Sequence, residues 1–531
     1  MVRSPLCLAV DLGTGGPKVG LVTLDGTMVA QTHRSVSTTY SDDGGATQDA
    51  ALWWELIRSS IGDLFGQDPS WPTAVRAVAV TGQWASTVPV DERGVPTGPC
   101  LTWQDRRGGR YVRARIGGPV AGYRPQALAT WIRHAAGVPS LAGADPIGHL
   151  LYLERAAPEQ LARTRWCLEP VDYLTMCFTG EASASHASMQ GAWLTDARAL
   201  GSYRYDQVLL DLSGLSDERL APLHPIGSIV GTVRPTVADD LGLSRDVVVI
   251  TGLPDLQSAA LGAGATTPLA AHLALSTTSW ISCPVAKKKT DALHSIATVP
   301  GLTNDSYLVA DNQETGARAL EWLRTVVGAG GPPMSFDALC DLAARAPLGS
   351  GGVAFMPWLA GERSPVDDHG ARGSFTNLSV TTDAAEVVRS VLEGVAYNTR
   401  WLLQAVERFT GHRLAPLRMV GGGAQSDVWC QIYADVLDRP VEQLPDPRFA
   451  QLRGMALMAG VALGEHRLDE VDRLVPTGRR FDPVPDHVDR YRQRAEELPL
   501  LYRALRRHRR KLARQASPDP RAPRASARWP R

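Results

Sequence analysis

The chain has 531 residues, of which 44% are hydrophobic and 21% charged, a profile typical of a globular enzyme with two or three domains. Lys and Arg balance Asp and Glu at 55 each, so the chain as a whole does not attract nucleic acid or a membrane, and a small-molecule partner is favoured. The seven cysteines are scattered and form no CxxC pair, which argues against a disulfide framework or a zinc site and indicates a reducing cytoplasm. No apolar window approaches the roughly 18 residues of a membrane span, and we expect no targeting signal.

The first thirty residues predict three short strands, at 8–10, 19–24 and 28–31, joined by tight turns. The turn after the first strand combines an acid, a hydroxyl, a lysine and several glycines: Asp11, Gly13, Thr14, Gly15, Gly16 and Lys18. Residues this small leave backbone N–H groups open to an anion. The turn is therefore consistent with phosphate binding, although an ordinary hairpin turn would look the same.

The rest of the first half reads as alternating helices and strands. We predict helices at 50–65, 146–157 and 158–163, the second capped by Asp145, and buried strands at 75–80 and 247–251. The last of these strands runs into Gly252-Leu253-Pro254-Asp255 and a helix over 256–264. This is a strand ending in a loop that opens a helix.

The second half repeats this order. A hairpin of two strands with a small-residue turn spans 273–285, followed by a strand at 307–310 and helices at 315–326 and 384–409. A strand at 418–420 then runs into glycines 421–423 and a helix at 426–437, which we match to the segment 247–264. The pattern predicts a duplicated α/β domain that holds its ligand in the cleft between the copies.

The motifs resemble those of the FGGY carbohydrate kinases, which are sugar and polyol kinases with the actin-like, ribonuclease-H-like ATPase fold. They are DLGTGGPK (11–18), WQDRR (103–107), EPVDYLTMCFTGE (169–181), GLPD (252–255), FMPWLAGERSP (355–365), RGSF with SVLEGVAYN (372–375 and 390–398) and GGGAQSDVWCQIYADVL (421–437). The resemblance implies an N-terminal domain over 1–262 that binds sugar, a nucleotide-binding domain over 263–502, and a tail over 503–531. It also implies ATP and Mg²⁺ as cofactors and suggests a homodimer.

The resemblance assigns two acids to the chemistry. Asp255 matches the general base that positions the sugar hydroxyl and accepts its proton, and the dipole of the following helix would keep it ionised. Capping that helix is the alternative role for Asp255. Asp11 matches the first-strand acid that orients Mg²⁺ beside the nucleotide phosphates, with a turn-forming Asp as the alternative.

Three segments match the nucleotide-binding parts of the family. Thr14 and Lys18 belong to the first phosphate loop and Thr277 and Thr278 to the second, so the two hairpins would grip the phosphates from opposite domains. The adenosine motif corresponds to Gly421, Gly422, Gly423 and Ala424, which could also be plain loop, and Ser426 is a candidate helix cap. The chain contains no GxxxxGK[ST], so the P-loop mechanism does not apply.

The sugar-facing residues depart from the best-known relatives. Gln83 is retained, but Trp84 and Ala85 replace the Arg-Glu of glycerol kinases and the Met-His of xylulose kinases. Glycerol is therefore disfavoured and xylulose is not established. Trp84 offers an apolar face for a sugar, or else belongs to the core. Asp105 is the best remaining hydroxyl acceptor, with Arg107 as its partner, or else forms a plain surface ion pair.

Further departures concern the family signature and the tail. Asn377 stands where the FGGY signature has a glycine. From residue 503 the chain is rich in Arg, Pro, Ala and Ser, which predicts disorder beyond the first helical turns. The tail would either contact nucleic acid or an anionic surface, or have no function. The expected function is an ATP-dependent, xylulokinase-like sugar, ketose or polyol kinase. A nucleotide-binding regulatory or scaffold protein without kinase activity is the alternative.

Overall fold

The structure, a computed structural model, describes residues 4–327 and 333–515. Strand β1 (Leu6–Gly13) forms the centre of the first sheet and is buried on both faces. Alternate side chains of a strand point to opposite faces, and here Leu8 and Val10 enter the core of the first domain, whereas Cys7 and Ala9 enter a second core shared between the domains. The continuous apolar run in the sequence therefore reflects two-sided burial.

The first domain is built on a seven-stranded sheet in the order β13-β14-β6-β1-β2-β3, with β15 pairing β6. Its other strands are β2 (Gly16–Thr23), β3 (Met28–His33), β6 (Val75–Gly82), β13 (Ile229–Thr232), β14 (Val248–Ile250) and β15 (Leu253–Pro254). The helices of this half are α1 (Ala50–Phe65), α2 (Trp71–Ala74), α3 (Gly109–Ile116), α4 (Pro125–Ala135), α5 (Pro146–Ala156), α6 (Pro158–Ala162), α7 (Pro170–Thr179), α8 (Gln207–Ser213), α9 (Pro235–Leu241) and α10 (Asp255–Gly262). Short strands complete it: β4 (Thr39–Tyr40), β5 (Ala46–Gln48), β7 (Val88–Val90), β8 (Cys100–Leu101), β9 (Gly117–Val120), β10 (Trp166–Leu168), β11 (Ala184–Ser185) and β12 (Leu223–His224).

The second half carries a five-stranded sheet in the order β17-β16-β24-β25-β26. Its strands are β16 (Ala271–Leu275), β17 (Ser279–Ser282), β24 (Leu417–Val420), β25 (Val441–Gln443) and β26 (Arg479–Phe481). Smaller sheets are formed by β18 (Pro284–Val285), β19 (Thr290–Asp291), β20 (Ile296–Pro300) and β21 (Tyr307–Ala310), and by β22 (Ala354–Met356) and β23 (Ser374–Thr376). The helices are α11 (Arg318–Val327), α12 (Phe336–Arg345), α13 (Ala384–Thr410), α14 (Asp427–Leu437), α15 (Ala450–Leu463), α16 (Val471–Leu474) and α17 (Pro485–Gln515).

Strand order corrects the way in which we matched the two halves. In the first sheet β1 pairs antiparallel with β2 and parallel with β6, and β6 pairs parallel with β14. In the second sheet β16 pairs antiparallel with β17 and parallel with β24, and β24 pairs parallel with β25. Strand β24 with its glycine loop therefore corresponds to β6, and not to β14 as the sequence pattern suggested.

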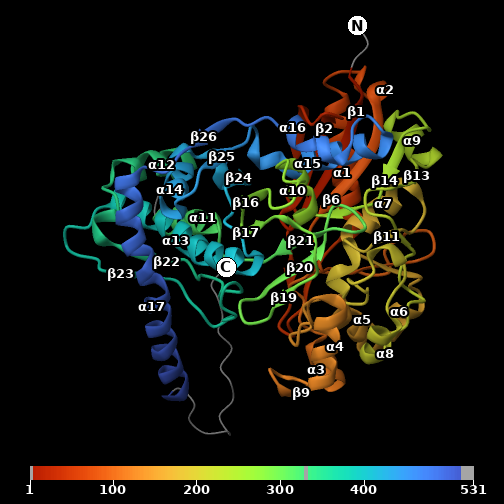
Figure 1. Cartoon of the computed structure of the whole chain (residues 1–531). Coiled ribbons are helices and arrows are strands. Elements are labelled where there is room, and N and C mark those ends of the chain that lie inside the picture. Colours follow the sequence, from red (N-terminus) through yellow and green to blue (C-terminus); the bar gives the residue numbers. More distant parts are fainter. Residues whose placement is uncertain (1–3, 328–332, 516–531) are drawn as a thin grey trace.

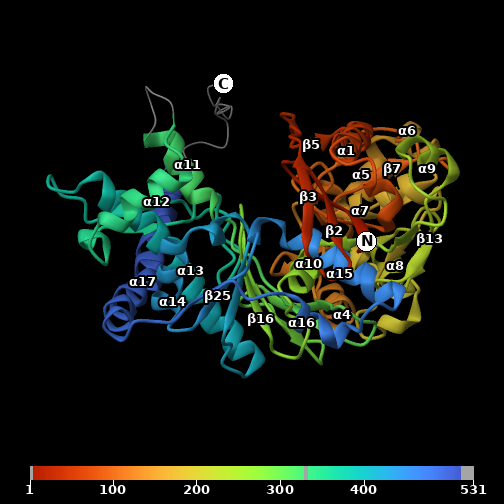
Figure 2. The ribbon, with the colours of Figure 1, turned by 90° about the horizontal axis from the view of Figure 1, so that it is seen from above.

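Helices α10 and α15 cross where the two domains meet. Figure 2 shows α15, blue because it lies late in the chain, among the elements of the first domain beside β2 and α10. The two helices cross closely because a glycine of each helix lies directly against the backbone of the other. A Cβ atom on Gly262 would lie 1.7 Å from the carbonyl oxygen of Ala450, and one on Gly454 would lie 2.0 Å from that of Ser258. Apolar side chains of both helices and both sheets form the shared core around it.

Most predicted elements are present, including helix α1 with the predicted bounds and the Ser426 cap, whose hydroxyl accepts from the amide of Trp429. Helix α11 was expected from residue 315 but begins at Arg318. The reason is that Gly316 and Ala317 donate their amides to carbonyls of the turn between β16 and β17 instead of continuing a helix.

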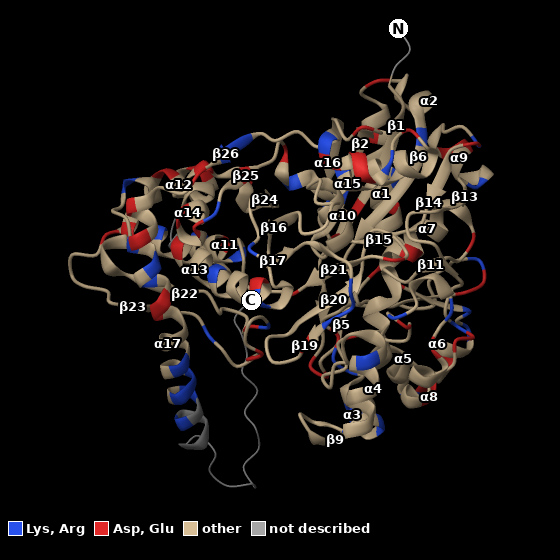
Figure 3. Ribbon diagram, viewed as in Figure 1, with Lys and Arg blue, Asp and Glu red and all other residues tan. Residues whose placement is uncertain are grey.

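The basic tail expected from residue 503 continues helix α17 as far as Gln515, and the remainder lies outside the described residues. Tyr502 and Arg509 donate to Asp368 Oδ2 at 3.0 and 2.9 Å, which ties this end of the helix to the body. Lys and Arg residues are concentrated along the lower end of α17 (Figure 3). None of the helices in the described segments is both long and apolar enough to cross a membrane.

Replacing Gly262 by Ala tests the helix crossing. The added methyl group cannot fit against the Ala450 carbonyl, so we expect Gly262→Ala to lower the free energy of unfolding by about 3 kcal/mol. Urea unfolding followed by circular dichroism measures the change. Gly62→Ala is the matched control, because Gly62 is an exposed glycine of α1 whose Cβ would meet no atom within 4 Å, and we expect a gain of about 0.5 kcal/mol there. Equal effects of the two variants would contradict the close packing of α10 on α15.

Candidate active site

The first hairpin is a tight two-residue turn. Strands β1 and β2 pair up to Gly13 and Gly16, which leaves Thr14 and Gly15 at the tip. Gly16 has a φ of 127°, and a Cβ atom there would lie 2.2 Å from the Arg34 carbonyl oxygen, so only glycine fits this position. The turn itself therefore requires Gly16, whereas a Cβ atom on Gly15 would meet nothing within 4 Å.

Three charged side chains lie near one another at the base of this hairpin. Asp11 is buried inside β1, which excludes a role as a turn residue, and Lys18 on β2 donates to its Oδ2 at 2.7 Å. Asp255 is the first residue of α10, and its carboxylate lies within electrostatic range of both Asp11 and Lys18. Two of the residues that the sequence assigned to the chemistry, from positions 244 apart in the chain, are thus neighbours in space.

The structure revises the expected ionisation of Asp255. Burial, followed by the nearby Asp11 carboxylate, raises the pKa of Asp255 to about 7, although Lys18 and the Leu256 amide favour the anion. Burial and the Asp11 carboxylate therefore outweigh the dipole of α10, which favours the ionised form of Asp255. Pro254, and not Asp255, occupies the N-cap of α10, so capping does not account for the acid.

The donor set around Asp11 fits a divalent cation. Mg²⁺ prefers hard oxygen ligands, commonly one or two carboxylates completed by water and phosphate. Asp11 supplies such a carboxylate beside the phosphate-type turn, and a cation bound there would offset the repulsion between Asp11 and Asp255. A second group of metal-type ligands consists of His134, Asp196 and Asp206. Arg198 bonds to His134 and Asp196, and Asp206 bonds to His134, so we assign no ion to this group.

The second hairpin and the glycine loop lie against each other. The turn between β16 and β17 closes through a hydrogen bond from the Ser276 amide to the Thr278 carbonyl at 2.9 Å, and Thr277 at its tip is exposed. Gly421 has a φ of 96°, and a Cβ atom there would lie 2.5 Å from the Leu275 carbonyl oxygen and 2.6 Å from Ser276 Oγ. A Cβ on Gly422 would meet nothing within 4 Å, so this side of the loop is open.

The loop after β6 reaches the first hairpin. Thr14 Oγ1 donates to Gln83 Oε1 at 3.5 Å and accepts from Trp103 Nε1 at 3.2 Å. Gln48 Nε2 donates to the Thr14 carbonyl at 2.8 Å, and Gln83 Nε2 donates to Gln48 Oε1 at 3.3 Å. Residues assigned to phosphate and to sugar therefore share one hydrogen-bond network.

Trp84 and Asp105 occupy different settings. Trp84 is half-buried and donates its indole N–H to the Ser188 carbonyl at 2.8 Å, so its ring orientation is fixed. Asp105 is fully buried and is no surface ion pair. Its carboxylate accepts from the Ala46 amide and from the Arg107 backbone and guanidinium, with a closest contact of 2.6 Å. Asp105 is thus already saturated with donors and holds two loops together.

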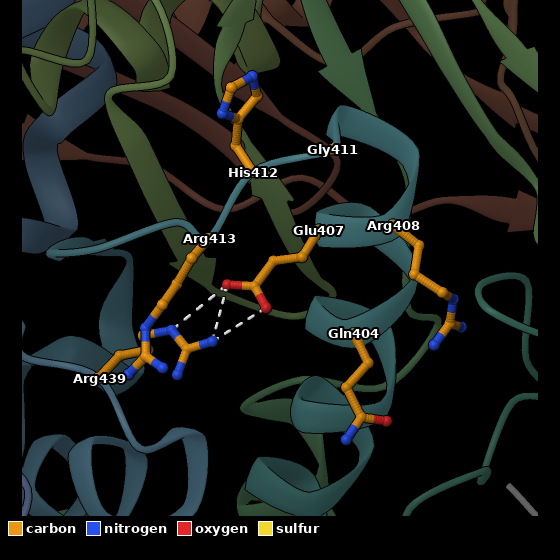
Figure 4. A pocket seen from close by; sticks show the side chains of 7 residues that line it. All are labelled: Gln404, Glu407, Arg408, Gly411, His412, Arg413 and Arg439. Atoms are coloured by element: carbon orange, nitrogen blue, oxygen red, sulfur yellow. Dashed lines mark hydrogen bonds and ion pairs between the residues drawn. The ribbon is translucent and has the colours of Figure 1, made fainter.

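A cavity of about 510 Å³ lies elsewhere, at the end of helix α13 (Figure 4). Arg439 donates to both carboxylate oxygens of Glu407 at 2.9 Å, so the buried charges of this cavity are mutually neutralised. None of the residues assigned to sugar, metal or phosphate lines it. We therefore place no substrate there.

Sequence reasoning missed several residues that support the site. Gln48 and Trp103 hold Thr14, and Gly316 closes on the second hairpin, where a Cβ atom would lie 2.4 Å from the Thr278 carbonyl oxygen. Trp103 lies in a motif that was noted, whereas Gln48 and Gly316 lie in no such motif. Asn377 has a φ of 63°, which explains how Asn can replace the signature glycine, since Asn tolerates this conformation best after Gly.

Comparison with known proteins places this site in a family. The chain matches the N-terminal domain of the FGGY family of carbohydrate kinases over residues 6–262 and the C-terminal domain of that family over residues 276–463. A xylulose kinase from Staphylococcus epidermidis is 26% identical over 500 residues, covering 93% of this chain and 96% of that protein. A gluconokinase from Bacillus subtilis is 23% identical over 507 residues, covering 91% and 93%. A solved xylulose kinase structure from Rhodospirillum rubrum has a TM-score of 0.79 and 26% identity, covering 95% of this chain and 99% of that one.

The chain belongs to the FGGY family of carbohydrate kinases. The expected two-domain α/β fold is confirmed by the solved kinase structures that it matches. Membership supports phosphorylation of a sugar with ATP, and kinases of this family typically use a divalent metal. The relatives carry the names of kinases for different sugars, so membership alone does not set the substrate.

The raised pKa of Asp255 predicts a pH-dependent effect of Asp255→Asn on stability. Below the ordinary Asp pKa of 3.8 both states hold the proton, and between 3.8 and about 7 only the unfolded chain ionises, so Asp255 increasingly opposes folding. We expect the variant to be as stable as the native chain at pH 3.5, to gain stability up to pH 7 by at most about 4 kcal/mol, and to gain no more above that. Urea unfolding with EDTA from pH 3.5 to 8.5 measures this, with exposed Asp239→Asn as control. A difference that does not vary with pH would contradict the assignment.

Proposed function

We propose that the protein transfers the γ-phosphoryl group of ATP to a hydroxyl of a sugar, ketose or polyol, in the manner of a xylulokinase. The observation that carries the proposal is the meeting of Asp255, at the start of α10, with the Asp11–Lys18 pair at the base of a phosphate-type hairpin. The carboxylate that would take the proton thus lies beside Lys18 and a turn suited to binding the phosphates of ATP. Family membership supports the reaction class, and this geometry supports the roles that we propose for these residues.

Asp255 is the proposed general base. A base with a pKa close to the working pH accepts a proton effectively while still being partly ionised, and Asp255 has a pKa of about 7. It would hydrogen-bond the acceptor hydroxyl, orient it toward the γ-phosphorus and take its proton as the new P–O bond forms and the bond to the leaving ADP oxygen breaks. General base catalysis of this kind contributes about 10² to 10⁴ in rate.

The nucleotide is proposed to lie along both hairpins and the glycine loop. Thr14 and Lys18 would bind its phosphates from the first domain, and Thr277 and Thr278 from the second. The adenosine would lie along Gly421, Gly422, Gly423 and Ala424, where the open side of Gly422 leaves room for it. Mg²⁺ bound at Asp11 would neutralise developing charge on the transferred group.

The sugar is proposed to bind between Trp84 and Asp255. The indole ring of Trp84, held by Ser188, presents an apolar surface to the C–H groups of the sugar, and Gln83 offers an amide beside Thr14. Asp105 has its hydrogen-bonding capacity filled by Arg107 and Ala46. We therefore assign it a positioning role rather than the direct contact with a sugar hydroxyl that its sequence suggested.

Phosphorylation of a substrate panel by the native protein and by Asp255→Asn tests the proposal. The panel comprises pentuloses, hexuloses, pentitols, simple polyols and gluconate. We expect at least one ketose or polyol to be phosphorylated, with kcat at least about 10³-fold lower for Asp255→Asn because the proton has no acceptor, and with ATP affinity within about threefold. Exposed Asp239→Asn should match the native rate. No turnover on any member of the panel, together with ATP binding by both proteins, would favour the regulatory alternative.

Trp84→Ala tests the sugar subsite. Loss of the indole surface should raise the KM for the sugar about tenfold, since stacking of this kind is worth roughly 1 to 1.5 kcal/mol, while the KM for ATP stays unchanged. Trp54→Ala is the matched control, because Trp54 is a half-buried tryptophan of α1 that packs on Phe178 at a ring distance of 4.9 Å. Parallel changes in both KM values would place Trp84 in the core rather than at the sugar.

A further inference from the structure

Residues 313–317, which we call the belt, connect β21 with α11 and run along the second hairpin. The amide of Gln313 donates to the Ser279 carbonyl at 2.8 Å, and its carbonyl accepts from the Ser279 amide at 3.1 Å. Gly316 donates to the Thr277 carbonyl at 3.0 Å and Ala317 to the Ser276 carbonyl at 2.6 Å. The turn that carries Thr277 and Thr278 is therefore bonded to the belt on several of its residues, and its position depends on where the belt lies.

The belt is held in turn by a buried carboxylate. Glu362 has no exposed surface and belongs to the loop between β22 and β23. Its Oε1 accepts from the amide of Glu314, in the belt, at 3.0 Å and from its neighbour Arg363 at 2.9 Å. Arg363 also pairs with the Glu314 side chain at 2.7 Å. The loop thus grips the belt through both the main chain and the side chain of Glu314.

Helix α13 also supports the belt, through Asn398, whose amide nitrogen and amide oxygen each have a defined hydrogen-bond partner. Asn398 Nδ2 donates to Glu362 Oε2 at 2.6 Å, while Asn398 Oδ1 accepts from Trp358 Nε1 at 3.3 Å. The amide oxygen is therefore occupied, and the amide nitrogen must face an acceptor. Gln313 Nε2 donates to the Asn398 carbonyl at 2.9 Å, which anchors the start of the belt to the same point.

We propose that Glu362 is a positioning residue for the nucleotide: through the belt it fixes the second phosphate hairpin, and so sets the affinity for the phosphates of ATP. The inference rests on the proposed function, in which Thr277 and Thr278 bind those phosphates. Glu362 itself touches no substrate. A donor fixed before the ligand arrives binds more tightly than one that must be ordered during binding.

Glu362→Gln is the most direct test, because it keeps the shape of the side chain and replaces one acceptor oxygen by a donor nitrogen. The new amide nitrogen faces Asn398 Nδ2, and since Trp358 occupies Asn398 Oδ1, two buried donors are left opposed. Glu362→Gln combined with Asn398→Asp restores a donor opposite an acceptor. Glu393→Gln is the matched control: Glu393 is equally buried in the same domain and accepts from Ser350, Arg389 and Tyr491, away from the belt.

The measurements are the Kd of a non-hydrolysable ATP analogue by calorimetry, the KM values for ATP and sugar, and urea unfolding. We expect Glu362→Gln to raise the Kd and the KM for ATP about tenfold with the KM for sugar within about twofold, and the double variant to recover most of the loss. Glu393→Gln should lose stability without losing nucleotide affinity. Amide hydrogen exchange at 276–279 should rise in Glu362→Gln alone.

The inference is overturned if Glu362→Gln and Glu393→Gln lose similar stability while both bind the analogue as the native chain does. Should Glu362→Gln not fold, Gly316→Ala disturbs the same contact from the other side, because its Cβ would lie 2.4 Å from the Thr278 carbonyl oxygen, and unchanged affinity there overturns the inference equally. If the native chain phosphorylates a sugar and the variants bind the ATP analogue as tightly as the native chain does, the inference fails while the proposed function stands. A native chain that binds no nucleotide defeats it together with the proposed function.

Discussion

The close crossing of α10 and α15 is the contact on which the rest of the structure depends. Gly262 and Gly454 let each helix approach the backbone of the other, and no residue with a side chain could replace either without moving a carbonyl group. The same two helices bury the apolar face of both sheets in one shared core. Because Asp255 is the first residue of α10, the contact that joins the domains also sets the position of the acid.

The duplication is symmetric in its backbone and asymmetric in its chemistry. By strand register, Asp11 in β1 corresponds to Ala274 in β16, because each pairs with the residue that precedes the glycine at the end of the next strand and lies on the sheet face turned to the shared core. The first residues of the crossing helices are Asp255 and Ala450. Both acids therefore occur only in the first copy, while the matching positions in the second copy are buried and apolar. In the proposed function the first copy would supply the metal and proton chemistry and the second would supply hydroxyls and open backbone to the nucleotide, so the site would be divided between the domains.

The sequence predicted local features well because those features have local causes. The bounds of α1 follow from its apolar period and its Asp49 cap, and the glycine at position 16 of the first turn follows from its positive φ. Which strands correspond between the halves was mistaken, because strand order in a sheet leaves no local signal. Arg107 lies two residues from Asp105 and was expected as its partner. The Ala46 amide that completes the donors to Asp105 and the Asp11 carboxylate that raises the pKa of Asp255 come from distant positions, so only the folded structure could supply them.

A second set of contacts joins the domains beside the sugar-facing loops. Lys288 and Thr290 donate to the Ile132 and Ala136 carbonyls at 2.8 Å, and Tyr307 donates to the Ala197 carbonyl at 2.7 Å. Rotation of one domain on the other about the helix crossing would have to break these three bonds, at a net cost of about 1 kcal/mol each. The apolar contact at the crossing is far harder to break, so the crossing is the natural axis of motion.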